Sequence, residues 1–81
     1  MNWEQYAEAI KEFCIYPDAG CKTDVEKAYL SLGLASEAGE VASLMKKEMR
    51  DGVEYDGEKW LSEIGDCVFY ITRILDVTGI L

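Results

Sequence analysis

Two pairs of carboxylates, each spaced three residues apart inside an apolar run with helical periodicity, constrain the fold of this chain most strongly. The first pair is Glu37 and Glu40, and the second is Glu63 and Asp66. Residues three apart on a helix share a face, so each run should present its two carboxylates side by side. If the two helices pack antiparallel, all four carboxylates can converge. They would then repel one another, and their oxygen atoms suit a hard cation such as Mg²⁺ or Mn²⁺.

A single Glu-x-x-Glu is usually only a solvated helix face, because glutamate favours helices. Glu37 differs, since it interrupts an apolar stripe between Leu34 and Val41, and a half-buried charge needs a partner. A glycine also lies between the carboxylates of each pair, at Gly39 and Gly65. A glycine inside a helix costs about 1 kcal/mol relative to alanine. Close approach of another backbone or of a ligand would explain that cost.

The rest of the pattern predicts an all-α fold in a single domain, residues 1–81, with three main helices. Apolar spacing favours a first helix over residues 3–14, which the turn at Tyr16-Pro17-Asp18-Ala19-Gly20 separates from the second. Thr23 and Glu26 form the pattern of a capping box at the start of a long helix. That helix should run to about Arg50 and stop at Asp51-Gly52. The third helix should begin after Asp56 and end near residue 78.

The two long predicted helices carry more apolar residues than one chain of 81 residues can cover. One face of the second helix consists of Ala28, Tyr29, Leu32, Ala35, Ala42, Met45 and Met49, and another of Leu30, Leu34, Val41 and Leu44. The core stripe of the third is expected to consist of Leu61, Ile64, Val68, Ile71 and Leu75. A helix that is apolar on two sides is buried on two sides, so we expect oligomerisation to complete the bundle.

Composition excludes several classes of function. A formal net charge of −8 argues against a nucleic-acid backbone or an anionic membrane as partner. The chain has no histidine, which excludes Ser-His-Asp and Cys-His mechanisms. No apolar run approaches the roughly 20 residues of a membrane span, and the start lacks the features of a signal peptide. The three cysteines read as reduced thiols, so we expect a cytoplasmic protein.

Few basic or aromatic groups are expected beside the carboxylates. Lys47 follows Glu40 by seven positions, and Arg73 follows Asp66 by seven, so each lies about two turns along nearly the same face. A lysine and an arginine flanking a metal cluster would suit a polyphosphate. For Lys47 the alternative, that it only complements the helix dipole, stays open. Tyr70, one turn beyond Asp66, reads as a core residue or as a platform for a nucleobase.

Together these residues resemble a known family. Glu37-x-x-Glu40, then 22 residues, then Glu63-x-x-Asp66, is similar to the signature of the MazG-like all-alpha nucleoside triphosphate pyrophosphohydrolases. The resemblance extends to residues 15–20, 32–41, 46–47, 50–52 and 63–70.

The resemblance implies a helical bundle assembled as a homodimer or a dimer of dimers. It also implies Mg²⁺-dependent hydrolysis of nucleoside triphosphates between the α- and β-phosphates, which yields the monophosphate and pyrophosphate. Glu37, Glu40, Glu63 and Asp66 would be the catalytic metal ligands, Lys47 would contact phosphate and Tyr70 would stack on the base. Small members usually continue into a further basic helical segment, which this chain does not contain. The alternative hypothesis is therefore a non-catalytic helical module that binds metal or nucleotide.

Overall fold

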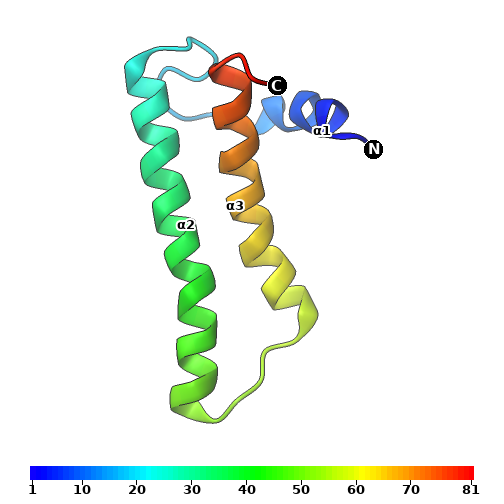
Figure 1. Cartoon of the computed structure of the whole chain (residues 1–81), viewed down its shortest axis with the longest axis vertical. Coiled ribbons are helices and arrows are strands. Elements are labelled where there is room, and N and C mark those ends of the chain that lie inside the picture. The colour runs from blue at the N-terminus through cyan, green and yellow to red at the C-terminus, as the bar shows by residue number, and fades with distance from the viewer.

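The computed structural model describes all residues, Met1–Leu81, and its regular structure is entirely helical (Figure 1). Helices α2 (Asp24–Asp51) and α3 (Gly57–Val77) lie side by side as an antiparallel hairpin. Helix α1 (Trp3–Ala9) crosses beside the C-terminal half of α3 and continues into the 3₁₀-helix η1 (Ile10–Phe13). The predicted all-α fold with three main helices is confirmed. No helix of the structure combines the length and apolar character needed to cross a membrane.

The first helix differs from the single element expected over residues 3–14. It begins with a capping box that the sequence reading missed, in which Asn2 and Gln5 each accept a hydrogen bond from the other's backbone amide. Its last turn tightens into η1, as is common where an α-helix ends. The indole of Trp3 donates a hydrogen bond to Oγ1 of Thr72 over 2.9 Å, which fastens α1 to α3.

The bounds of the long helices agree with the sequence prediction to within a residue or two, because each bound has a local cause. The Oγ1 atom of Thr23 accepts a hydrogen bond from the amide of Glu26 and caps α2. Gly52 ends α2 in the left-handed region, with φ 67°, where glycine is favoured. The carboxylate of Asp56 accepts a hydrogen bond from the amide of Lys59 over 2.9 Å and caps α3.

The capping box predicted at Thr23 is only half formed. The Glu26 carboxylate does not return to the amide of Thr23 but is fully buried and accepts hydrogen bonds from the amides of Gly20 and Lys22 at 2.7 and 2.9 Å. The Tyr16 hydroxyl donates to it over 2.6 Å. Glu26 therefore organises the loop that precedes α2, since a buried carboxylate needs several donors.

The two apolar faces of α2, both expected to be buried, are covered unequally within one chain. Leu30 and Leu44 are buried between the helices, whereas every member of the other face, the seven residues from Ala28 to Met49, is exposed. The predicted core stripe of α3 is wrong for a single chain. Leu61 is 69% exposed, and Ile64, Val68 and Ile71 are also exposed. The α3 side chains that are buried instead are Thr72, Arg73 and Val77, because one helical hairpin can cover only one side of each helix.

Candidate metal centre

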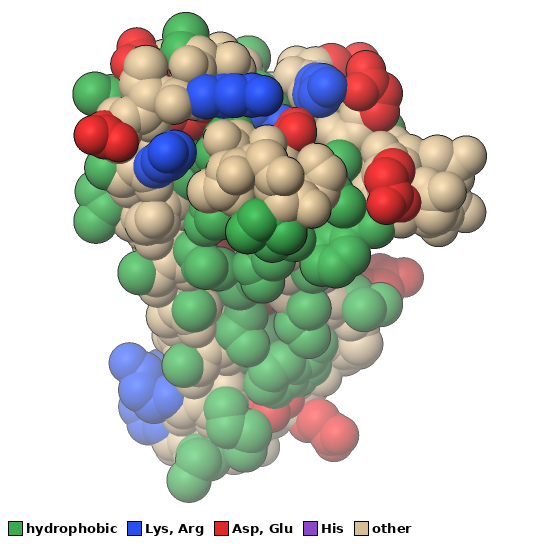
Figure 2. All heavy atoms as spheres, turned by 45° about the horizontal axis from the view of Figure 1, so that its top comes forward, with side chains coloured by type: hydrophobic (Ala, Val, Ile, Leu, Met, Phe, Trp, Pro, Cys, Tyr) green, Lys and Arg blue, Asp and Glu red, His purple; other side chains and the backbone are tan.

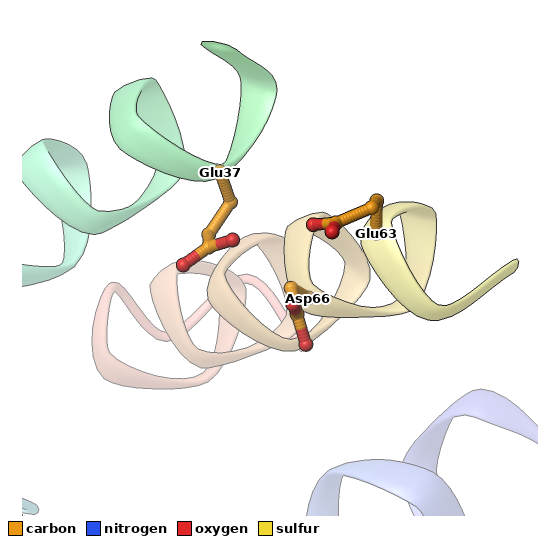
Figure 3. A group of neighbouring side chains, drawn as sticks. All are labelled: Glu37, Glu63 and Asp66. Atoms are coloured by element: carbon orange, nitrogen blue, oxygen red, sulfur yellow. The ribbon is translucent and has the colours of Figure 1, made fainter. Parts of the chain in front are cut away.

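Carboxylates from α2 and α3 converge near the middle of the hairpin. Glu37 projects from α2 toward α3, where Glu63 and Asp66 lie one turn apart (Figure 3). One oxygen from each of the three carboxylates lies within 4.8 Å of the others. The i, i+3 spacing on α3 and the antiparallel packing of the two helices produce this grouping.

The grouping concentrates negative charge in a region that is partly shielded from solvent. Glu37 and Glu63 are half-buried, and Asp66 is exposed. Burial raises the pKa of Glu37, and the charges of Asp66, Glu63 and Glu40 raise it further. Burial and the same cluster also raise the pKa of the neighbouring Cys67 thiol, which favours its neutral form.

The one cation paired with this cluster is Lys59, whose Nζ lies 3.2 Å from Oε1 of Glu63. This pair lies at i, i+4 on α3, and the spacing alone could have revealed it, although the sequence reading missed it. The Lys59 side chain is about half exposed, at 49%, so it can swing away when another cation binds.

The donor set fits a hard divalent cation. All three donors are carboxylate oxygens, and Mg²⁺ and Mn²⁺ prefer oxygen ligands. Oxygens on opposite sides of an octahedral Mg²⁺ lie about 4.2 Å apart. The 4.8 Å spread of Glu37, Glu63 and Asp66 therefore needs only a small change of side-chain torsions to close on one ion.

Glu40 lies outside this group of three. It is exposed on α2, one turn beyond Glu37, and its charge still contributes to the raised pKa of Glu37. The two glycines between the paired carboxylates have open space around them, because a Cβ built on Gly39 or Gly65 would meet no atom beyond its own stretch of helix within 4 Å. The close approach predicted at these glycines is thus not made within one chain.

Tyr70 packs inside the hairpin, near the cluster. Its ring lies directly over Gly33, where an added Cβ would come within 2.2 Å of the ring. Its centroid is 6.5 Å from that of Tyr29 and 5.4 Å from that of Phe69. Burial raises the pKa of Tyr70, with a further contribution from Tyr29, so the phenol stays neutral. The sequence reading missed the role of Gly33, because only the packed pair of helices brings it to Tyr70.

The two basic residues considered beside the carboxylates are placed differently. Lys47 is half-buried on α2, seven residues and therefore about 10 Å along the axis from Glu40, as its spacing requires. The expectation for Arg73 is wrong. Its guanidinium is buried at the end of the hairpin, where it donates to Asp76 over 2.6 Å and contacts Glu26 at 3.4 Å. A fully buried carboxylate attracts an arginine more strongly than a partly exposed cluster does, because the local dielectric is lower.

The chain is similar in sequence to a protein of a mycobacterial phage. The chain is 34% identical to the Gene 37 protein of Mycobacterium phage L5 over 79 residues, which cover 91% of this chain and 69% of the relative. No family model matches the chain, and no solved structure matches it. On the extent of that identity, the chain belongs to the same family as the Gene 37 protein of Mycobacterium phage L5.

Proposed function

We propose that this protein is a Mg²⁺-dependent nucleoside triphosphate pyrophosphohydrolase of the MazG-like type, which cleaves (deoxy)nucleoside triphosphates to the monophosphate and pyrophosphate in the cytoplasm. The observation that carries the proposal is the convergence of Glu37, Glu63 and Asp66 from two helices, with oxygens within 4.8 Å of one another. The spacing of the two carboxylate pairs in the sequence led us to expect four converging carboxylates, and three of them lie together here.

The chain's own residues suit this chemistry. A bound divalent cation would polarise the phosphates and lower the pKa of a bound water. Glu37, Glu63 and Asp66 would hold it, and Glu40, exposed one turn away, would add a fourth carboxylate from the solvent side. Like charges contribute to the raised pKa of Glu37, and a bound cation would relieve this repulsion. Tyr70 lies one turn beyond Asp66 and would be the aromatic on which the base stacks.

The proposed assembly is a homodimer or a dimer of dimers. The radius of gyration is 14.5 Å, whereas a compact domain of this length has about 12 Å. The accessible surface is 5456 Å², against about 4,900 Å² for a monomer of this mass. Many of the exposed large hydrophobic residues lie on α2 and α3, and Figure 2 shows hydrophobic side chains along the length of the hairpin.

The alternative is a non-catalytic module that binds metal or nucleotide. One observation favours it: Arg73 is engaged with Glu26 and Asp76, so the group of three carboxylates has only Lys59 as a paired cation. Turnover of a polyphosphate would then depend on cations from a partner chain, whereas binding of a metal ion would not.

The test is pyrophosphate release from a panel of canonical and modified nucleoside triphosphates, with Mg²⁺ and with chelator. We expect metal-dependent release with the monophosphate as co-product. Glu40→Gln should abolish it while leaving the helical fold intact, and Glu58→Gln, an exposed residue of α3 outside the cluster, should leave it unchanged. Metal-independent release, or full turnover in Glu40→Gln, would contradict the proposed mechanism. Mg²⁺ binding without turnover would favour the alternative.

A further inference from the structure

A cavity of about 340 Å³ lies at the opposite end of the hairpin from the long turn, between η1, the loop before α2 and the C-terminal end of α3. Its size falls within the range of small-molecule sites in proteins. Figure 2, in which this end of the molecule comes forward, shows Lys and Arg side chains gathered there. None of its lining residues belongs to the carboxylate cluster. Arg73, which borders it, follows Asp66 by seven residues, or about 10 Å along α3.

The cavity concentrates positive charge in an acidic protein. Lys11, Lys22 and Arg73 line it, and Asp76 is its one carboxylate, so the lining carries a net +2 (three cations less one anion). The whole chain carries −8. Lys11 is partly offset by an ion pair with Glu8 at 2.8 Å, whereas Lys22 forms no ion pair. Glu26 contacts Arg73 as well, so Lys22 is the one lining cation without an ion pair, and a compact anion would meet less repulsion here than over most of the surface.

Arg73 gives the cavity a buried and fixed donor. Its side chain is only 4% exposed, and it contacts Tyr16, Glu26 and Asp76 at 3.3, 3.4 and 2.6 Å. A guanidinium has five N–H donors, so these three contacts leave two without a protein acceptor. The planar fork of an arginine suits the paired oxygens of a phosphate group.

The loop on the other side is held in an uncommon conformation. Lys22 has φ 59° and Asp18 has φ 60°, in the left-handed region that lysine rarely adopts. The buried Glu26 keeps the loop there by accepting hydrogen bonds from the amides of Gly20 and Lys22. The same carboxylate contacts Arg73, so one buried group positions both the guanidinium and the loop that carries Lys22. Pre-organisation of this kind lowers the cost of binding.

We propose that this cavity is a binding site for a small phosphate-bearing anion, held by Arg73 from within and by the ammonium groups of Lys11 and Lys22 at the rim. Inorganic pyrophosphate is the simplest probe, because it offers two phosphate groups to three cations. The proposal does not depend on the carboxylate cluster or on any hydrolytic activity.

The experiment is an NMR titration of the metal-free, desalted protein with inorganic pyrophosphate at constant ionic strength. Without metal the carboxylate cluster repels the probe, so failure of this site and failure of the metal centre are distinguishable. We expect saturable shifts of the amides of Ala19, Gly20 and Lys22. Lys22→Asn removes the ammonium and suits the left-handed φ, since asparagine is enriched there. It should weaken binding about tenfold, the loss typical of one charge-assisted hydrogen bond.

A control variant and a second test variant make the result decisive. Lys46→Gln, on the exposed surface of α2 away from the cavity, should bind pyrophosphate as the unchanged protein does. Lys11→Gln removes the other rim cation without touching the loop, and should weaken binding even if Lys22→Asn perturbs the loop itself. Non-saturable shifts, equal shifts with chloride, or unchanged affinity in Lys11→Gln would overturn the proposal. Shifts centred on Glu37 and Glu63 would overturn it as well.

Discussion

Replacing Gly33 with alanine should destabilise the protein, whereas the same change at Gly39, six residues along the same helix, should stabilise it. Alanine is better than glycine inside a helix by about 0.5–1 kcal/mol, and this gain applies at both positions. The positions differ in what the new methyl group would meet. At Gly39 there is no other atom within 4 Å, but at Gly33 the Tyr70 ring lies at 2.2–2.7 Å.

The size of the difference follows from that contact. Ordinary packing begins at 3.4 Å, so the ring over Gly33 must move by at least 1.2 Å (3.4 less 2.2). Tyr70 is held between Tyr29 and Phe69, and forced overpacking of this kind costs about 1–3 kcal/mol. After the gain in helix propensity, Gly33→Ala should be destabilising by about 0–2.5 kcal/mol and Gly39→Ala stabilising by up to about 1 kcal/mol.

Thermal unfolding followed by circular dichroism measures the difference. For a chain of this length 1 kcal/mol corresponds to about 4–8 °C, so Gly39→Ala should melt clearly above Gly33→Ala. Both variants should be compared at the same protein concentration and with their oligomeric states measured, because association shifts the melting temperature. If Gly33→Ala raises the melting temperature as much as Gly39→Ala does, the packing of Tyr70 on Gly33 is refuted.

Three further predictions concern charge and assembly. Glu26→Gln should cost about 1.5–3 kcal/mol at neutral pH, because it removes the buried carboxylate that accepts from Tyr16 and two loop amides, while Arg73 keeps its ion pair with Asp76. Burial by itself would raise the pKa of Glu26, but hydrogen bonds from Tyr16 and the loop amides lower it overall. The stability that the charged Glu26 contributes is therefore present above the unfolded pKa of 4.5 and is lost as the pH falls through the lower folded value. In urea melts at a series of pH values, the free energy of unfolding of the variant should fall less steeply at acid pH than that of the unchanged protein. Glu37→Gln should act in the opposite direction in metal-free protein. The raised pKa of Glu37 means that the folded chain loses stability as the pH rises from 4.5 through the folded value, and the variant should lack this loss. The variant should also bind Mg²⁺ less tightly than the unchanged protein. Leu32→Asp, at a position 73% exposed in one chain, should reduce the mass measured by light scattering if that face is an interface, whereas Ile15→Asp, 92% exposed in the loop, should not.

The helices could be predicted from the sequence because local signals determine them. Thr23, Gly52 and Asp56 mark helix ends through their own side chains or backbone angles, and the structure agrees with them. The grouping of Glu37 with two carboxylates of α3 also followed from spacing and antiparallel packing. Both kinds of inference use contacts within one helix or between two neighbouring ones.

The features that the sequence did not reveal depend on distant contacts. Glu26 and Arg73 are 47 residues apart, and their pairing needs the loop before α2 to fold against the end of α3. Spacing from Asp66 alone therefore assigned Arg73 to the wrong place. The third-helix stripe that includes Leu61 was predicted as core because periodicity identifies an apolar face but not what covers it.

The most direct test of the metal centre is paramagnetic broadening of amide signals by substoichiometric Mn²⁺. The chain has 16 acidic residues, so non-specific binding would broaden signals along much of the surface. We predict that the amides around Glu37, Glu63 and Asp66 broaden first, that excess Mg²⁺ restores them, and that Asp66→Asn abolishes the selectivity. Uniform broadening, or broadening centred on other acidic segments such as residues 54–58, would contradict a cation site between α2 and α3.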